Sequence, residues 1–375
     1  MAVYIYQLRD WPHFTWEEER LITLLTEVRH KQGRLLGQMQ SLGFNLQMEA
    51  TLQTLTADIL RSSEIEGEIL DAEQVRSSVA RRLGLEIAGM VPADRHVERI
   101  VEMMLDATQN FKEPLTGERM FGWHAALFPS GRSGMHKIVS GNWRDNDAAD
   151  PMQIVSGPLN RQTIHFQAPD SATLPDEMDA FLKWFNEETN IDLVLKAAIA
   201  HLWFVTIHPF DDGNGRIARA VADMQLARSD NSSQRFYSMS AQIRNERNAY
   251  YNILEATQKG SLDITDWLEW FLGCLDRALS STDQTIGVVL KKARFWEQQK
   301  TVPLNARQVL MLNKLLDGFE GKLNSSKWAT ITKSSPDTAI RDINDLIQKG
   351  ILQRNDAGGR STSYSLKADG LDMHQ

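Results

Sequence analysis

Twelve consecutive residues, His208 to Arg219, carry the densest set of chemically useful side chains in this sequence. Pro209 and the glycines after it interrupt a helical pattern, and a helix-forming stretch resumes at Arg216. The turn from Gly213 to Gly215 therefore leads into a helix. The first backbone N–H groups of a helix have no partner within it and the helix dipole is positive at that end, so such a turn favours an anion. The pattern indicates a phosphate site.

Neighbouring side chains supply what a phosphate-transferring site needs. Arg216 and Arg219 are three residues apart on one face of the predicted helix and can hold two phosphate groups through forked hydrogen bonds. Asp212 offers a hard oxygen ligand to magnesium, an ion that proteins usually hold with one or two carboxylates plus substrate phosphates. His208 has an ordinary pKa of about 6.5, so a neutral imidazole can accept a hydroxyl proton at neutral pH. The alternative is a glycine-capped helix with solvated charges.

The same twelve residues resemble the signature of the Fic family, His-x-Phe-x-Asp/Glu-Gly-Asn-Gly-Arg-x-x-Arg, at every fixed position. The usual activity of that family is transfer of AMP from ATP to a hydroxyl side chain of a target protein. The resemblance implies ATP as substrate, Mg²⁺ (or Mn²⁺) as cofactor, and a mainly α fold with a helical Fic core and a β-hairpin flap. It implies these roles: His208 as base, Asp212 as metal ligand, Gly213, Asn214 and Gly215 as phosphate cradle, Arg216 as β-phosphate ligand and Arg219 as γ-phosphate ligand.

Two flanking segments extend the resemblance, which covers roughly residues 93–280. A hairpin-forming segment lies where the family carries its flap, an exposed strand edge that holds the target by strand addition. The flap positions are Ile154, Val155, Ser156 and Gly157. Three further residues lie where relatives place the adenine pocket, although many relatives have Asn instead of Gln at the last position. These are Tyr250, Tyr251 and Gln258.

A segment N-terminal to this core, Ser62 to Gly67, resembles the inhibitory motif Ser/Thr-x-x-x-Glu-Gly/Asn of one Fic class. Ser62 and Glu66 are four residues apart and share one helix face. The resemblance implies that Glu66 pairs with Arg219, so that this arginine cannot hold the γ-phosphate and ATP binds in an unproductive pose. The alternative is that Glu66 is one charge of an acidic run on a solvated helix, made of Glu64, Glu66 and Glu68.

Apolar periodicity along the chain predicts a mainly helical protein. Two short β-prone runs, 152–155 and 163–166, predict a single hairpin within the core. A charged helix is expected to end near Lys300. The helical stretches are 16–70 as a hairpin of helices, then 93–110, 118–127, 174–188, 191–207, 216–228, 246–258 and 264–280. We therefore expect an N-terminal helical domain with the inhibitory motif at 1–90, a Fic catalytic domain at 91–285 and a further domain at 301–370.

The stretch after Pro303 has the element order of a winged helix. Its expected helices are 306–316, 325–331 and 336–349, and its expected strands are 351–354 and 361–366. Residues 301–375 hold ten Lys/Arg and eight Asp/Glu, a local charge of +2. The candidate recognition helix, 336–349, offers few cations for DNA phosphates, whereas Arg354 and Arg360 lie on the wing. Docking of a protein therefore ranks slightly ahead of binding of DNA.

The composition and net charge limit the class of protein and the cell compartment that this chain suits. The 375 residues are 42% apolar and 24% charged, which suits a globular chain of two or three domains. No stretch of 18 apolar residues and no signal peptide is visible, and the single cysteine, Cys274, excludes an internal disulfide, so a cytoplasmic protein without membrane contact is expected. The net charge of -8 argues against wholesale wrapping of nucleic acid.

The sequence therefore predicts a protein adenylyltransferase acting on Tyr, Thr or Ser of a target protein or of itself, inhibited by Glu66. Relatives also suggest a homodimer. One alternative is transfer of another phosphate-linked group, or removal of AMP by a water that Glu66 orients. An alternative of another class is a winged-helix DNA-binding regulator whose Fic core only senses nucleotide.

Overall fold

The computed structural model describes residues 3–41, 43–87, 89–147, 149–158, 161–316, 318–319, 321–355 and 362–367. This part of the chain is mainly helical, as the sequence predicts. The first helices are α1 (Glu18–Gln40), α2 (Phe44–Ile65), α3 (Ala72–Arg82), α4 (Arg95–Gln109), α5 (Gly117–Leu127), α6 (Leu174–Asn186) and α7 (Leu193–Ile207). The others are α8 (Asn214–Asp230), α9 (Met239–Asn245), α10 (Arg247–Gln258), α11 (Thr265–Gln298), α12 (Ala306–Leu316), α13 (Ser325–Thr332) and α14 (Pro336–Gln348). Among the described helices, none combines the length and the apolarity that crossing a bilayer requires.

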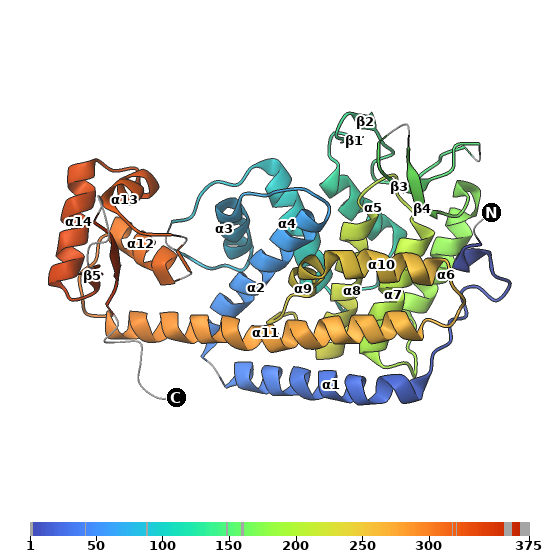
Figure 1. Ribbon diagram of the computed structural model, residues 1–375, viewed down its shortest axis with the longest axis horizontal. Helices are drawn as coiled ribbons and strands as arrows, with labels where there is room; N and C mark the ends of the chain where they lie inside the picture. Colours follow the sequence, from blue (N-terminus) through green and yellow to red (C-terminus); the bar gives the residue numbers. More distant parts are fainter. Residues whose placement is uncertain are drawn as a thin grey trace.

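The largest hydrophobic core of the described residues is built from residues between Ile5 and Leu279, a part of the chain here called the larger unit. Helices α7 and α8 form the centre of the larger unit (Figure 1). Every residue of α7 from Val194 to Ile207 is buried, and its apolar side chains point in all directions, which is the pattern of a helix surrounded by protein. Helix α8 is buried along most of its length as well. Because both helices are enclosed, the loop between them, residues 208–213, is held by the core at both of its ends.

Helix α11 runs along the molecule from the larger unit to the C-terminal unit (Figure 1). It has 34 residues, so at 1.5 Å per residue it is about 50 Å long. The sequence pattern predicts two helices here, one ending at residue 280 and another ending near residue 300. The polar residues at the expected break stay helical, and the Ser281 and Thr282 hydroxyls donate to the Ala278 carbonyl one turn back. The helix continues through residue 285 without interruption.

The expected hairpin in the core is present as strands β3 (Gln153–Ser156) and β4 (Thr163–Gln167). The strands are antiparallel, with Ile154 opposite Phe166 and Val155 opposite Ile164, so the register shifts between them. Phe166 is buried, whereas Val155 and Ile164 are exposed. A second short hairpin, β1 (Arg132–Ser133) with β2 (His136–Lys137), lies before it and was not expected from the sequence.

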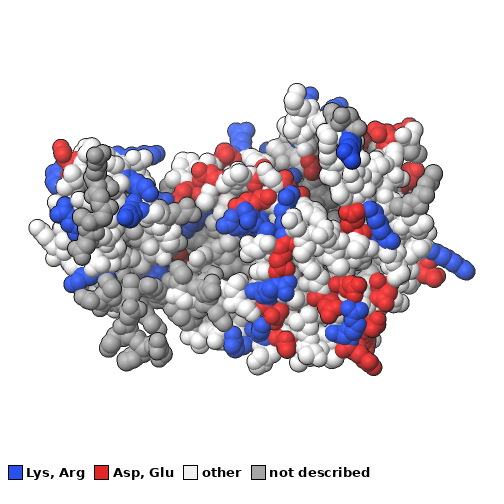
Figure 2. Space-filling view, viewed as in Figure 1, with Lys and Arg blue, Asp and Glu red and all other residues white. Residues whose placement is uncertain are grey.

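The C-terminal unit has a hydrophobic core of its own around Trp328, Met311 and Ile343. Helices α12, α13 and α14 are followed by strands β5 (Leu352–Arg354) and β6 (Tyr364–Leu366), in the order predicted from the sequence. Arg360 and the expected turn of the wing lie outside the described residues. On the face in Figure 2, Lys and Arg side chains are scattered over this unit, and the larger unit shows acidic and basic side chains interspersed.

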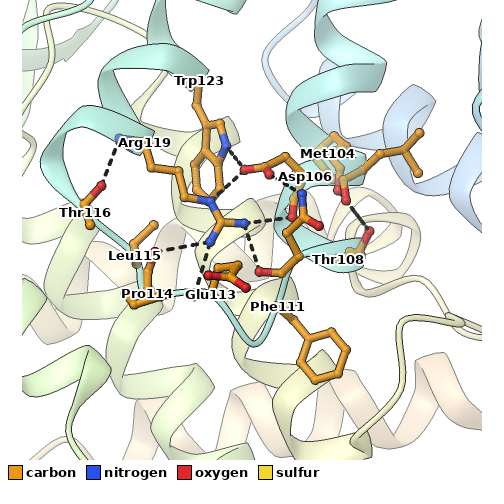
Figure 3. A network of polar contacts seen from close by, with 12 residues as sticks. Met104, Asp106, Thr108, Phe111, Glu113, Pro114, Leu115, Thr116, Arg119 and Trp123 are labelled. Carbon is orange, nitrogen blue, oxygen red and sulfur yellow. Dashed lines mark hydrogen bonds and ion pairs between the residues drawn. The ribbon is translucent and has the colours of Figure 1, made fainter.

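A network of polar contacts joins the end of α4 to the start of α5 (Figure 3). The Asp106 carboxylate accepts hydrogen bonds from Arg119 Nε and Trp123 Nε1, both at 2.7 Å. The Arg119 guanidinium also donates to the carbonyl groups of Asp106 and Asn110, which lie at the C-terminal end of α4. The same two carbonyls also accept backbone hydrogen bonds, from the N–H groups of Asn110 and Glu113, so the guanidinium adds a second donor to each. These contacts fix α5, whose His124 lies next to the loop after α7.

Helix α2 is tied to the core by buried charges. The Asp58 carboxylate on α2 accepts hydrogen bonds from the Ser238 hydroxyl at 2.5 Å and the Ser240 backbone N–H at 3.2 Å. Close by, Asp223 on α8 pairs with Arg235 at 2.9 Å, with both side chains at most 3% exposed. These contacts hold the helix that carries the predicted inhibitory motif against α8.

We predict that Arg235→Met lowers the free energy of unfolding by about 3–5 kcal/mol, because it leaves the Asp223 carboxylate buried without its partner. Urea denaturation measures the change. Arg61→Met is the matched control, since Arg61 forms an exposed pair with Glu64, and it should cost less than about 0.5 kcal/mol. Equal losses in the two variants would contradict the assigned importance of the buried pair.

Candidate active site

The loop after α7 begins at His208, whose backbone is left-handed, with φ 53° and ψ 58°. This conformation turns the chain sharply out of α7 and is uncommon for a residue with a side chain. The imidazole is 9% exposed, and its Nδ1 lies 3.3 Å from the carbonyl oxygen of Val205. Because Nδ1 donates to that carbonyl, the neutral ring carries its free lone pair on Nε2. Burial lowers the pKa of His208 to about 4, so the ring is neutral at pH 7.

Arg144 holds this loop through hydrogen bonds to its backbone. Its Nε donates to the carbonyl of His208 at 2.8 Å, and its backbone N–H donates to the carbonyl of Pro209 at 2.9 Å. A further guanidinium nitrogen donates to the carbonyl of Pro169 at 2.5 Å. Arg144 is 2% exposed and positions the histidine through its backbone. The sequence contains no signal for it, because Arg144 lies in a Gly- and Pro-rich stretch without periodicity.

His124 supports the same loop from α5 and was also missed by the sequence analysis. Its ring stacks on Phe210, with ring centroids 4.3 Å apart and planes 5° from parallel. Its Nδ1 accepts from the backbone N–H of Gly141 at 3.0 Å, so Nε2 is the donor to the carbonyl of Asp212 at 3.2 Å. Burial lowers the pKa of His124 to about 4. Phe210 is fully buried and anchors the loop in the core.

The carboxylate of Asp212 lies at the start of the glycine turn and is partly exposed. One oxygen accepts from the backbone N–H of Gly213 at 2.5 Å, and the other contacts the hydroxyl of Ser133. The neighbouring Asp211 is engaged by the backbone N–H of Val139 at 2.8 Å. The described residues contain no cluster of three or more potential metal ligands. This donor set fits a magnesium ion only when phosphate oxygens of a substrate complete its coordination.

The N-terminus of α8 has the form that binds anions. Gly213 has φ +79°, and a Cβ there would lie 2.8 Å from the Phe128 ring, so only glycine fits this turn. Within the described residues, no side chain caps the helix. The Asn214 side chain instead bridges the backbone of Phe210, at 3.0 Å to its N–H and 2.7 Å to its carbonyl. Asn214 can therefore offer a phosphate its backbone N–H, while its side-chain amide is held by the Phe210 backbone.

Both signature arginines are buried and already face carboxylates of this chain. Arg219 is 2% exposed, and its Nη1 lies 2.9 Å from Glu66 Oε1. Its Nε donates to the Ser62 hydroxyl at 3.0 Å and its Nη2 to the Ser62 carbonyl at 2.9 Å. Arg216 Nη1 lies 2.7 Å from Glu68 Oε2. The predicted inhibitory segment thus contacts Arg219 directly, and the residue just after it, Glu68, contacts Arg216.

The Glu66 carboxylate also lies over the first turn of α8. A Cβ on Gly215 would fall 2.2 Å from Glu66 Oε1, so the oxygen almost touches the glycine backbone. Glu66 follows the last residue of α2, and Gly67 turns the chain with φ +83°. The position at the helix N-terminus, where an anion is favoured, is therefore taken by this chain's own carboxylate.

The predicted adenine residues are not equally accessible. Tyr250 is 2% exposed and its hydroxyl lies 2.9 Å from Nε2 of the buried His201. Gln258 is 3% exposed and donates to the Thr206 hydroxyl at 3.3 Å. Tyr251 is 37% exposed, and the Arg247 guanidinium lies 5.3 Å from its ring centroid. Of the three, Tyr251 presents the surface that a base could contact.

The predicted flap residues lie on and just after β3, on the upper edge of the larger unit (Figure 1). Ile154 and Val155 are 36% and 40% exposed. The Ser156 hydroxyl lies 2.6 Å from His165 Nε2, and His165 Nδ1 lies 2.7 Å from Glu255 on α10. This chain of contacts ties the hairpin to the helix that carries Tyr251.

Comparisons with known proteins agree with this architecture. A family model described as "Fic/DOC family" matches residues 114–226, and one described as "Domain of unknown function (DUF4172)" matches residues 4–85. Two proteins called "Protein adenylyltransferase Fic", from Drosophila yakuba and Drosophila melanogaster, are each 28% identical over 232 residues, which is 59% of this chain and 40% of theirs. This chain therefore spans about two fifths of these relatives.

A solved structure has a similar fold. The crystal structure of a Fic family protein from Desulfovibrio desulfuricans G20 superposes with a TM-score of 0.54 and 21% identity, covering 95% of this chain and 98% of that one. The match extends over nearly the whole chain, including the parts outside the region that the Fic/DOC model matches.

We predict that His208 stays neutral until about pH 4, whereas His96, whose contact with Glu68 raises its pKa, titrates above about 6.5. Histidine NMR through a pH series measures both, and His208→Ala assigns the signal. His124, His201 and His208 all have lowered pKa values, so between about pH 6.5 and 4 the unfolded chain binds more protons than the folded one. The free energy of unfolding should therefore decrease as the pH is lowered from about 6.5 to 4. Titration of His208 near 6.5 would contradict this assignment.

Proposed function

We propose, from the premise that residues 114–226 of this chain form a Fic/DOC family domain, that the protein transfers AMP from ATP to a hydroxyl group of a target protein. The observation that carries the proposal is the combination of a buried neutral His208 with two buried arginines at an uncapped helix N-terminus. That arrangement suits a triphosphate chain placed beside a base. The name of the relatives, protein adenylyltransferase, supports AMP as the group transferred.

In the proposed reaction the target oxygen attacks the α-phosphorus of ATP. Its proton passes to His208 Nε2, the bond from the α-phosphorus to the bridging oxygen breaks, and pyrophosphate leaves. The N–H groups of the first turn of α8 and the guanidinium of Arg216 would hold the β-phosphate, and Arg219 would hold the γ-phosphate. A Mg²⁺ or Mn²⁺ ion held by Asp212 would neutralise phosphate charge. Arg144 and His124 contribute by keeping the loop rigid, which preserves the position of the base.

Target binding is assigned to the flap. The exposed backbone and side chains of Ile154 and Val155 suit an extended segment that adds to the edge of β3. Such an addition would bring a Tyr, Thr or Ser hydroxyl of the target toward the loop after α7. Tyr251 is the residue we assign to the adenine ring, because it is the most exposed of the three adenine-pocket candidates.

Glu66 is proposed to inhibit the transfer. Its carboxylate pairs with Arg219 and lies against Gly215, so the γ-phosphate and Glu66 would compete for one guanidinium and one helix end. ATP bound without the Arg219 contact would leave its α-phosphate away from the line of attack. The alternative that Glu66 is only a solvated surface charge is disfavoured by this contact with a buried arginine.

We predict that Glu66→Gly raises AMP transfer at least about tenfold, equivalent to about 1.4 kcal/mol of barrier. ATP labelled on the α-phosphate, incubated with the variant and a cell lysate, measures the transfer as labelled protein. His208→Ala should abolish labelling in either background, because the hydroxyl then has no base. Glu64→Gly is the matched control: Glu64 precedes Glu66 by two residues but pairs with Arg61 and Arg244. Equal labelling by the wild type and the Glu66 variant would remove the inhibitory role.

The same experiment separates the alternatives. Mass spectrometry of the labelled target identifies the added group, so another phosphate-linked group would show a different added mass. Loss of label after the nucleotide is removed would indicate removal of AMP by the same site. The homodimer stays a prediction, because no contact described here bears on it.

For the C-terminal unit we propose docking of a protein partner rather than DNA. On α14, Asp342 is paired with Arg307. Lys349, which follows the last residue of that helix, is paired with Asp345, so this described region offers few cations free for phosphates. The exposed Arg341 is the exception, with its guanidinium bonded only within its own helix.

We predict that duplex DNA binds weakly or not at all to the full chain at moderate salt. Titration at low and moderate salt, followed by fluorescence anisotropy, measures the affinity and its salt slope. Tight binding with a steep salt slope would instead favour a DNA-binding regulator with a nucleotide-sensing core. Arg341→Ala would then weaken the binding, which identifies α14 as the contact.

A further inference from the structure

A second carboxylate follows Glu66 at a spacing of two residues and contacts the other signature arginine. Glu68 Oε2 lies 2.7 Å from Nη1 of Arg216, while Glu66 Oε1 lies 2.9 Å from Nη1 of Arg219. Gly67 lies between them with φ +83°, a conformation that reverses the chain and is easily adopted only by glycine. The turn is closed by the backbone N–H of Glu68, which donates to the carbonyl of Ser63 at 3.0 Å.

The contact between Glu68 and Arg216 is not an ordinary surface pair. The Arg216 side chain is 9% exposed, and its guanidinium lies 5.1 Å from the ring centroid of Phe128. Its Nε is buried and makes no hydrogen bond within the described residues. An exposed ion pair contributes little, but a guanidinium that is buried against a ring depends on the anion that it faces. Arg216 therefore needs an anion, and Glu68 is the one it has.

His96 holds Glu68 from the other side. Its Nε2 contacts Glu68 Oε1, so the carboxylate bridges an imidazole on α4 and a guanidinium on α8. The hydrogen bond from His96, together with the charge of Arg216 and against the effect of burial, lowers the pKa of Glu68. The same hydrogen bond raises the pKa of His96. Glu68 is therefore an ionised carboxylate at neutral pH.

We infer that Glu68 is a second internal anion, which occupies Arg216 in the way that Glu66 occupies Arg219. The inference rests on the proposed function, in which Arg216 holds the β-phosphate. Each signature arginine then has its own carboxylate, and both carboxylates belong to one turn of three residues. Removal of Glu66 alone frees the γ-phosphate ligand but leaves a competitor at the β-phosphate ligand. ATP must displace Glu68, and His96 offers that side chain a partner when it leaves Arg216.

Glu68 could have the opposite effect on nucleotide binding. If Glu68 instead orients Arg216 for the β-phosphate, as a supporting residue does in many sites, then its removal weakens nucleotide binding. The two roles therefore predict changes of opposite sign. The change in ATP affinity caused by one substitution at Glu68 distinguishes them.

The experiment uses the full chain in the Glu66→Gly background. Glu68→Gln removes the charge at nearly constant volume, and Glu64→Gln is the matched control, because Glu64 pairs with Arg61 and Arg244 instead of α8. Calorimetric titration with ATP and Mg²⁺, and separately with inorganic pyrophosphate, measures the affinities. We expect both ligands to bind about tenfold more tightly after Glu68→Gln and within twofold of the parent after Glu64→Gln. An unchanged or weaker affinity after Glu68→Gln overturns the inference.

Two further measurements make the result unambiguous. In the NMR pH series, Glu68→Gln should lower the pKa of His96, which reports loss of the contact in the folded protein without any ligand. Glu68→Ala, tested alongside, guards against a new hydrogen bond from the glutamine.

If tighter pyrophosphate binding occurs but no variant transfers AMP, the proposed function fails and the role of Glu68 stands. If Glu66→Gly transfers AMP and the Glu68 change adds no affinity, the role of Glu68 fails and the proposed function stands.

Discussion

Positive charge gathers at the N-terminus of α8, and the arrangement of the surrounding elements depends on neutralising it. Arg216 and Arg219 are both almost fully buried there, next to backbone N–H groups that no described side chain caps. A buried guanidinium without an anion is costly, so a structure that places two of them on one helix turn must supply anions from somewhere. In this conformation the chain supplies them itself, from the turn that follows α2. A triphosphate would supply the same charge from outside, so in the proposed function its phosphates compete with Glu66 and Glu68 for the two guanidinium groups.

Rigidity around the loop between α7 and α8 is the second requirement. A base is useful only if it stays where the reacting hydroxyl arrives, and His208 lies in an uncommon backbone conformation that needs support. Arg144 bonds to the carbonyl of His208, His124 bonds to the carbonyl of Asp212, and Asn214 bonds to the backbone of Phe210. All three side chains act on the backbone of the loop and leave its functional side chains free. The enclosed helix α7 provides the fixed end from which the loop departs.

The segment that we propose to be inhibitory connects the N-terminal helices to this site. Helix α2 is attached through Asp58 to the residues before and within α9, and α8 carries the buried pair of Asp223 and Arg235 nearby. A shift of α2 would therefore disturb buried polar contacts as well as the two carboxylates. Movement of the whole helix, as one way to release the proposed inhibition, would have to overcome those contacts. Displacement of the Glu66 and Glu68 side chains alone needs only rotations about their own bonds.

The amino-acid sequence by itself determined the helical architecture and the hairpin over 153–167, and it predicted the chemistry of the stretch from His208 to Arg219, because these depend on local periodicity and on contiguous residues. It could not reveal Arg144 or His124, which lie 64 and 88 residues from the backbone atoms they hold and stand in segments without a pattern. It left Glu68 as one charge in an acidic run, and it could not show that, of the three predicted adenine residues, Tyr250 and Gln258 are buried and Tyr251 is exposed. Only the tertiary structure decided which carboxylate meets which guanidinium, since that depends on how α2, α4 and α8 pack and not on spacing along the chain.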